Sequence, residues 1–342
     1  MKKSLLALAV LGAFAGAASA QSSVTLFGTL DVNGRYVKAD GQSRRVSEAT
    51  DGINSSQLGF RGVEDLGGGL KASFMLLAGT NPDNGTANAK FWNRRSTVSL
   101  LGGFGEVRLG RDYTPDFWNT TIFDAFGTNG LGSSLNVWQG LAPGLSGFHV
   151  RQDNSIGYFL PSNLGGFYGQ AMVAASEGGT TADKAGRYVG ARFGFAAGPF
   201  DVAFAAAQQR LDLLAGAPQQ KSYNIGGSYD LGVVKLLGYF DRETLQGARE
   251  STGSFSVVVP IGQSEIHVGY DRSKLTNAGV STSIDQIKAT YQYNLSKRTA
   301  LYATASRLAN KDATRNTLAG AAGAVTAGGK SQGAEFGVRH FF

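Results

Sequence analysis

Several features that are common in folded proteins are missing from this sequence. None of the 342 residues is a cysteine, so the chain forms neither disulfides nor thiolate metal sites. After the first twenty residues, no run of about 18 or more apolar residues occurs, which excludes a membrane-spanning helix. Proline is scarce at 7 residues, whereas glycine is abundant at 49. Stability without disulfides then requires another source, and a large closed sheet provides one.

Catalytic motifs are also missing. The sequence holds three histidines, and it shows no Gly-x-Ser-x-Gly, His-x-x-x-His or phosphate-loop pattern. We therefore expect no enzyme, no cofactor and no metal site. The formal charge of +7 permits a nucleic-acid partner, but no basic run with interleaved aromatic residues and no recognition-helix pattern occurs. An adhesin or an assembly component would bring a large plug or passenger domain, and no such segment is visible.

The first twenty residues form a segment of their own. Lys2 and Lys3 make a short basic region, residues 5–15 are apolar, and Ala18-Ser19-Ala20 is a small-residue cleavage site. This order is typical of a secretory signal peptide, residues 1–20. After its removal, residues 21–342 form a single domain whose formal charge is +5, because the two lysines are lost.

What is present in the remaining chain is alternation. Between residues 24 and 36 one face carries Val24, Leu26, Leu30, Val32 and Tyr36, and the other face carries Thr25, Thr29, Asp31, Asn33 and Arg35. This stretch is longer than the usual soluble strand of about 5–6 residues. It suits a tilted membrane strand of roughly 9–11 residues or more.

The alternating pattern recurs with two kinds of connection. Seven connections are short and glycine-rich, and eight are longer and polar, at 38–52, 79–90, 113–147, 178–184, 212–220, 244–250, 275–282 and 310–330. Their strict alternation predicts sixteen strands, near 23–37, 53–65, 69–78, 91–102, 104–113, 148–160, 166–177, 185–197, 200–211, 221–231, 232–243, 251–259, 264–274, 283–294, 298–309 and 332–342.

An open sheet edge in lipid would leave backbone groups unpaired at a cost of several kcal/mol each. We therefore expect an all-β fold, a closed transmembrane antiparallel barrel of sixteen strands, with both termini on the side of the short turns and the long loops facing outward. A repeat architecture is the competing fold, but no fixed period or repeated motif is visible.

The last ten residues support closure. Phe342, His340, Val338, Phe336 and Ala334 share one mostly apolar face, and the chain ends on two aromatic residues. A frayed terminus of a soluble protein rarely ends in this way. We expect this strand to pair with the first strand, and the alternative is an ordinary edge strand.

The third long connection, residues 113–147, breaks the pattern. It holds about 35 residues, and a structureless loop of that length is usually functional or disordered. Its many apolar side chains, from Phe117 to Trp138, argue against disorder. We expect them to pack against the inside wall of the barrel.

Six segments in order along the chain carry a family resemblance: 22–31 (SSVTLFGTLD), 58–67 (LGFRGVEDLG), 94–100 (RRSTVSL), 107–112 (VRLGRD), 294–302 (NLSKRTALY) and 337–342 (GVRHFF). Together they resemble the general trimeric porins of Gram-negative outer membranes, especially the β-proteobacterial type. The resemblance implies a homotrimer, a third loop folded into the lumen, and a terminal Phe342 that is read by the outer-membrane barrel assembly machinery.

The resemblance also implies a cluster of arginines on the wall opposite the third loop. Strand parity points Arg61 and Arg95 into the lumen, and Arg94 exchanges with Arg95 if the register shifts by one. Arg151 starts the sixth strand. The alternative is that these are solvated lumen charges without a special role. Many relatives carry an arginine where this chain has Gln57, so the resemblance implies a weaker basic cluster and a weaker anion preference here.

Two carboxylates in the third loop, Asp116 and Asp124, complete the candidate constriction. Relatives set acidic loop residues across from the arginines, and the alternative reading is that both residues anchor the loop by accepting hydrogen bonds. The expected function is passive diffusion of small hydrophilic solutes and ions through an outer-membrane channel that prefers anions. The alternative is a substrate-specific porin with a saturable site for an anionic metabolite.

Overall fold

The computed structural model describes residues 23–141, 150–175, 186–211 and 218–342. Eighteen strands occur in these residues, and two of them, β2 (Arg45–Thr50) and β5 (Thr86–Ala87), belong to loops. The other sixteen form one antiparallel sheet: β1 (Ser23–Ala39), β3 (Gln57–Gly67), β4 (Leu70–Asn81), β6 (Arg95–Gly102), β7 (Gly105–Tyr113), β8 (Arg151–Phe159), β9 (Phe167–Ala174), β10 (Tyr188–Ala197), β11 (Phe200–Arg210), β12 (Gln219–Asp230), β13 (Lys235–Leu245), β14 (Ala248–Ile261), β15 (Ser264–Asn277), β16 (Val280–Asn294), β17 (Thr299–Asn310) and β18 (Lys330–Phe341).

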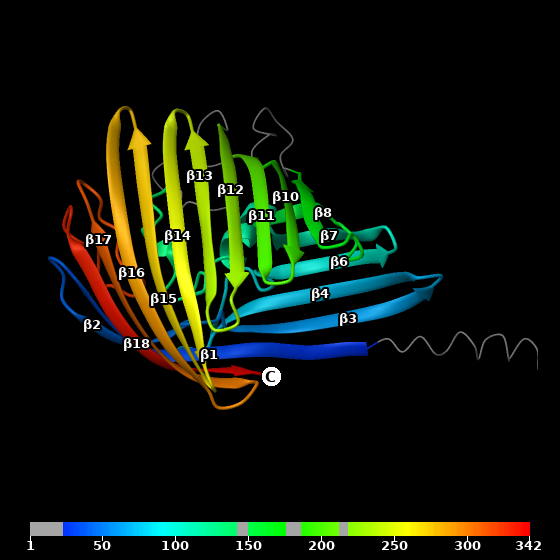
Figure 1. The fold of residues 1–342 in the computed structure, drawn as a ribbon, viewed down its shortest axis with the longest axis horizontal. Helices are drawn as coiled ribbons and strands as arrows, with labels where there is room; N and C mark the ends of the chain where they lie inside the picture. The colour runs from blue at the N-terminus through cyan, green and yellow to red at the C-terminus, as the bar shows by residue number, and fades with distance from the viewer. Residues whose placement is uncertain (1–22, 142–149, 176–185, 212–217) are drawn as a thin grey trace, which may run out of the picture.

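The sheet closes into a barrel because β1 pairs with β3 on one side and with β18 on the other. In Figure 1, β1, β3 and β4 cross steeply relative to β12, β13 and β14, as tilted strands on opposite walls do. At the seam, the N–H groups of Gly28 and Phe342 each donate to the other residue's carbonyl oxygen at 3.1 Å. The predicted closure by the C-terminal strand is confirmed.

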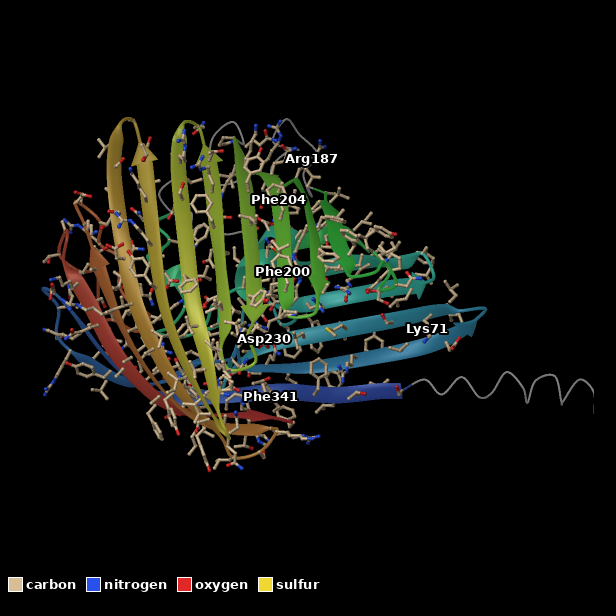
Figure 2. The ribbon with its side chains drawn as sticks, viewed as in Figure 1. Lys71, Arg187, Phe200, Phe204, Asp230 and Phe341 are labelled. Carbon is tan, nitrogen blue, oxygen red and sulfur yellow. The ribbon has the colours of Figure 1, made fainter. Side chains whose placement is uncertain are left out.

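Side chains alternate between the lumen and the outer surface. In β1, Asp31 and Asn33 are buried, whereas Val24 is 66% and Leu30 is 42% exposed. Phe200 and Phe204 of β11 point outward from the wall in Figure 2. The protein is therefore polar inside and apolar outside, as lipid requires of a membrane barrel. The alternation that the sequence predicts is confirmed.

Each of the sixteen predicted strands overlaps an observed strand, but two predicted long loops are wrong. The expected loops at 244–250 and 275–282 are two-residue hairpins, Gln246-Gly247 and Ala278-Gly279. Their φ angles are 47° and 88° in the first hairpin, and 49° and 81° in the second. Two consecutive positive φ angles produce a type I′ turn, whose twist matches the flanking strands, so the polar residues on either side continue the ladder.

The third long loop joins β7 to β8 and carries two short helices, α2 (Pro115–Ile122) and the 3₁₀ helix η1 (Ser134–Val137). Neither helix has the length and apolar content that a membrane crossing needs, in the part of the chain that the structure describes. The predicted signal peptide, residues 1–20, lies outside the described residues. The same holds for the loop expected at 178–184 and for most of the loop expected at 212–220.

Candidate functional site

The third loop turns away from β7 through a capped helix. Thr114 caps α2 by accepting a hydrogen bond from the Phe117 N–H, and Pro115 occupies the first turn, where its missing N–H costs nothing. Asn119 on this helix is fully buried. Its amide donates to the Ala203 carbonyl at 2.9 Å and to Asn224 Oδ1 at 2.8 Å. The helix is therefore held against inward-facing groups of β11 and β12.

The rest of the described loop is bonded to the neighbouring wall. The N–H groups of Gln139 and Gly140 donate to the Glu250 carboxylate at 2.8 and 3.0 Å, and the Tyr239 hydroxyl donates to Ser134 at 2.8 Å. Apolar loop residues form one buried cluster with wall residues, made of Val37, Phe117, Leu131, Val137, Trp138, Ile284, Leu308 and Leu318. Burial of these side chains gives the loop one position.

Three arginines meet on the opposite wall, around Tyr113. The Tyr113 hydroxyl accepts hydrogen bonds from Arg94 at 2.9 Å and from Arg151 at 2.6 Å. The Arg151 guanidinium also lies over the tyrosine ring, 4.2 Å from its centre, and the Arg95 guanidinium lies at 5.7 Å. We call Arg94, Arg95 and Arg151 the arginine wall.

A cavity of about 500 Å³ separates the arginine wall from the loop. Its lining from the loop consists of Phe117, Trp118, Thr121, Gly127, Thr128, Asn129 and Leu135. Tyr113 stacks on Phe117 with ring centres 5.7 Å apart and also contacts Trp118 at 5.0 Å. The tyrosine thus joins the arginines to the start of the loop.

The charges of the arginine wall are only partly compensated. Arg95 is paired with Asp112 at 2.6 Å, and Asp112 is shared with Arg108 at 2.5 Å. Neither Arg94 nor Arg151 forms an ion pair within the described residues, and the buried Nε atom of each has no hydrogen-bond partner there. Two positive charges therefore border the cavity without a carboxylate partner among the described residues.

Arg61 lies apart from this cluster. It is exposed, and its guanidinium lies over the ring of Phe27 with 5.1 Å to the ring centre. Phe27 and Gln57 line the cavity, but Arg61 does not. The structure brings together three of the four predicted arginines, and Arg61 does not line the cavity that they border.

The two loop carboxylates face away from the arginines. Asp116 is buried and accepts a hydrogen bond from the Tyr188 hydroxyl at 2.6 Å. Asp124 accepts the N–H of Phe126 at 3.0 Å and pairs with Lys288 at 3.3 Å. These contacts match the anchoring alternative.

Sequence reasoning did not single out Tyr113, Asp112 or Lys288. Asp112 and Tyr113 directly follow Arg111 at the entry to the third loop. A β-bulge there shifts the pairing of β7 with β8, so simple alternation does not predict which of these side chains points inward. Arg111, the residue before them, pairs with Asp153 at 2.7 Å. Lys288 lies between apolar outward neighbours. The strand alternation therefore predicts that its side chain points into the lumen, and this signal was available in the sequence.

In the described ranges, no group of three or more His, Cys, Asp or Glu side chains is arranged to hold a metal ion. A closed sixteen-stranded barrel with a polar interior and a charged cavity beside a folded loop defines an outer-membrane channel. The Gram-negative porin family matches residues 7–313, and the chain belongs to this family. It is a channel of the outer membrane and not an enzyme.

Individual relatives agree with this assignment. The chain is 40% identical to outer membrane porin protein 32 of Delftia acidovorans over the full length of both chains. It is 32% identical to the major outer membrane protein P.IB of Neisseria gonorrhoeae over 52% of this chain and 49% of that one. The solved anion-selective porin from Comamonas acidovorans superposes with a TM-score of 0.86 and 37% identity, covering 94% of this chain and all of that one.

Proposed function

We propose that this porin passes small hydrophilic solutes and inorganic ions by passive diffusion and prefers anions. The arginine wall carries this proposal, because Arg94 and Arg151 border the cavity without a carboxylate partner among the described residues. The loop carboxylates Asp116 and Asp124 are turned to other partners. The anion selectivity named for the Comamonas porin, which is 37% identical, supports the same preference.

The mechanism needs no energy source. In a narrow space bordered by low-dielectric walls, a few fixed positive charges raise the local concentration of anions and lower that of cations. Added salt screens these charges, since the Debye length falls from about 10 Å at 0.1 M to about 3 Å at 1 M. The preference for anions should therefore weaken as the salt concentration rises.

The third loop sets the size limit in this proposal. Its residues from Phe117 to Leu135 form the side of the cavity that faces the arginines. Apolar loop residues are buried against the barrel wall behind the loop, and this burial keeps the loop in place. Solutes then pass between an apolar and hydroxyl-bearing loop surface and a cationic wall. This arrangement combines a steric limit with a charge preference.

A second candidate is a substrate-specific porin with a saturable site for an anionic metabolite. The Nε atoms of Arg94 and Arg151, which have no hydrogen-bond partner among the described residues, favour it, because guanidinium groups bind carboxylates and phosphates with paired hydrogen bonds. A titration of single-channel conductance with dicarboxylates and phosphate esters separates the two. A general pore shows no saturable block, whereas a specific site does.

The anion preference is tested by the zero-current potential of the purified protein in a planar bilayer under a KCl gradient. We expect the sign of that potential to indicate chloride preference at low salt. A potential of cation-selective sign would overturn the proposal and would make buried carboxylates such as Asp116 the dominant charges.

A homotrimer is also proposed. Gly28, Gly34, Gly62 and Ala72 lie on the outer face of the first strands, where small residues permit close packing of barrels. Gly28 and Gly62 lie against the rings of Phe342 and Phe74, so Gly34, which has open space beside it, supports this surface best. The mass in mild detergent should correspond to three chains, and a single-chain mass with retained conductance would contradict this.

The proposal also covers the export of the protein and its insertion into the outer membrane. Residues 1–20 would be removed as a signal peptide, which leaves residues 21–342 as one barrel domain. Phe342 would serve as the signal for the barrel assembly machinery, and outer-membrane lipid would surround the outward apolar side chains. Deleting Phe342 should lower the amount of assembled barrel in the outer membrane, as measured by heat-modifiable gel mobility.

A further inference from the structure

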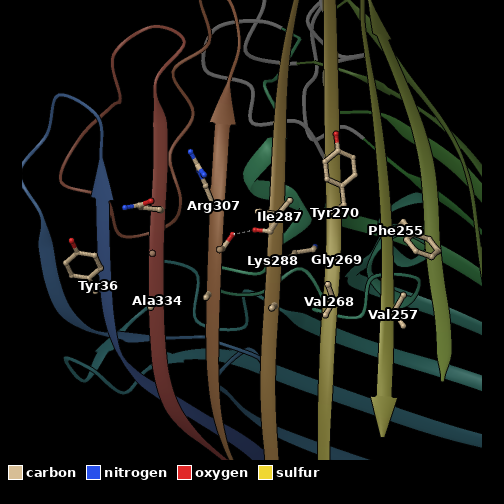
Figure 3. A pocket seen from close by; sticks show the side chains of 15 residues that line it. Tyr36, Phe255, Val257, Val268, Gly269, Tyr270, Ile287, Lys288, Arg307 and Ala334 are labelled. Atoms are coloured by element: carbon tan, nitrogen blue, oxygen red, sulfur yellow. Dashed lines mark hydrogen bonds between the residues drawn. The ribbon is translucent and has the colours of Figure 1, made fainter. Parts of the chain in front are cut away.

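Most apolar side chains of this barrel point outward or lie under the third loop. On β14, β15 and β16, the outward residues Phe255, Val268 and Ile287 are 51–56% exposed, and Figure 3 shows them on the outer face of the wall. Ile284 and Leu308 are covered by the loop, because they belong to its buried cluster. Since the interior of a membrane barrel is otherwise polar, an apolar side chain that lines a cavity of the lumen indicates a specific use.

Four inward-facing apolar side chains gather at the cavity beside the arginine wall. They are Phe27, Met75, Leu77 and Phe341, and they lie outside the cluster under the loop. Phe27 and Leu77 meet above Gly59, since a Cβ atom added to this glycine would lie 2.6 Å from Phe27 and 2.7 Å from Leu77. The missing side chain lets the two residues form one continuous surface. We call Phe27, Met75, Leu77 and Phe341 the apolar floor.

The third loop adds apolar surface on the other side of the cavity. Trp118 and Leu135 line the cavity and are half-buried, so part of each side chain stays uncovered. The Tyr113 ring is less available, because Phe117 stacks on it and the Arg151 guanidinium lies 4.2 Å from its centre. A flat apolar ligand would therefore lie between the apolar floor and Trp118.

The charged residues of the cavity belong to the arginine wall. Arg94, Arg95 and Arg151 line it, and its described lining includes no carboxylate, lysine or histidine. Arg94 and Arg151 each donate from Nη2 to the Tyr113 hydroxyl, and their Nη1 atoms make no hydrogen bond within the described part of the chain. Two guanidinium groups that share one acceptor oxygen are close enough to bind one carboxylate together, and this carboxylate would offset their mutual repulsion.

The size and the asymmetry of the cavity limit which anions match it. Its volume is about 500 Å³, within the range of roughly 300–1,000 Å³ that is usual for small-molecule sites. A dicarboxylate with charges at both ends would bring its second charge against apolar side chains, which is unfavourable. Phosphate or chloride would leave the apolar surfaces unused. A single carboxylate on a flat apolar body matches both parts of the lining.

We propose that this cavity is a saturable site for aromatic monocarboxylates, of which benzoate is the simplest. The carboxylate binds Arg94 and Arg151, and the ring lies between the apolar floor and Trp118, where contacts between aromatic rings add to the effect of burial. The inference rests on the proposed function and deepens it, since the ligand enters through the anion-preferring channel. A bound aromatic anion occupies the path of chloride and lowers its current.

The test measures the block of chloride current by benzoate, with the purified full-length porin in a planar bilayer at low salt. We expect a saturable block whose half-blocking concentration is about tenfold or more below those of acetate and succinate, because burial of a ring corresponds to at least this factor. Benzamide, which has the ring without the charge, should not block. Equal or tighter block by succinate or inorganic phosphate would overturn the proposal, and so would equal block by benzamide.

F27T/L77T makes the apolar floor more polar and leaves the three arginines in place. We expect its half-blocking concentration of benzoate to rise about tenfold, whereas its zero-current potential in a KCl gradient should match that of the unmodified protein. R94Q/R151Q should lose both the benzoate block and much of the chloride preference. L237T is the matched control, because Leu237 is buried on the inward face of β13 and does not line this cavity. It should change neither quantity.

Two failures are distinguishable in these measurements. Retained chloride preference without saturable benzoate block would overturn the aromatic site and leave the proposed function standing. A zero-current potential of cation-selective sign would overturn the proposed function and the site with it. An unchanged benzoate block in F27T/L77T would also overturn the site. If this double variant does not assemble, L77T alone should still raise the half-blocking concentration of benzoate above that of L237T, and equal values would overturn the proposal.

Discussion

Charged side chains line both sides of the lumen, but they are paired with one another on one side and lack some partners on the other. On the side covered by the third loop, Lys288 lies between Asp124 at 3.3 Å and Asp271 at 2.9 Å, and all three side chains are fully buried. On the arginine wall, Arg94 and Arg151 keep donors without partners among the described residues. Charges on the covered side pair with one another beside the loop, whereas Arg94 and Arg151 border the cavity without a carboxylate partner among the described residues.

The largest expected effect comes from breaking the covered side with K288M. This change leaves two buried carboxylates, Asp124 and Asp271, without their cation. Removing one partner of a buried ion pair typically costs about 3–5 kcal/mol. We expect a loss of this size in the free energy of unfolding, measured by urea denaturation in detergent or vesicles.

A variant that removes the whole triad controls for this prediction. D124N/K288M/D271N leaves no unpaired charge at the site, so it should be more stable than K288M alone. If K288M is as stable as the unmodified protein, the triad does not hold the loop and the contrast between the two sides fails.

The next largest effect concerns the loop itself. Replacing residues 116–140 with a short Gly-Ser linker should raise single-channel conductance and admit larger solutes, because the lining of the cavity opposite the arginines is removed. A matched excision of residues 82–88 from the second loop should change conductance little. Unchanged conductance after the first excision would mean that the third loop does not limit the pore.

A moderate effect is expected from the arginine wall. R94Q/R151Q removes the two charges that lack a carboxylate partner among the described residues, so chloride preference should fall clearly at 0.1 M salt. At 1 M salt the two proteins should behave more alike, since the Debye length is then about 3 Å. Zero-current potentials at both salt concentrations measure the difference, and an unaltered potential at low salt would place the selectivity elsewhere.

The smallest effect is expected from R61Q. Arg61 is exposed, rests on Phe27 and does not line the cavity. Its removal should change the zero-current potential less than R94Q or R151Q alone. A larger change would show that the narrowest point lies nearer the short-turn end of the barrel, and would redefine which residues form the constriction.

Much of the fold was predictable because its determinants are local. Lipid outside and water inside impose a two-residue period on every strand, and β1 shows it plainly in the contrast of Val24 with Asp31. The two hairpins at Gln246-Gly247 and Ala278-Gly279 were missed because the polar residues beside them have the composition of a loop, although these residues continue the strands up to each turn. Parity predicted that Arg95 points inward, and the family resemblance added Arg94 and Arg151, which line the same cavity. Arg61 was grouped with them, but it does not line the cavity.

The sequence by itself determined a closed barrel, its strand number, its inward and outward faces and its anomalous third loop, since each depends on neighbouring residues and on the solvent on each side. Only the tertiary structure decided which charges are cancelled. Asp124 meets Lys288 across 164 positions, and Glu335 meets Leu131 across 204. Such pairs form only after the barrel closes around the loop, because closure brings distant strands within hydrogen-bond distance of it and removes the water that would otherwise solvate them.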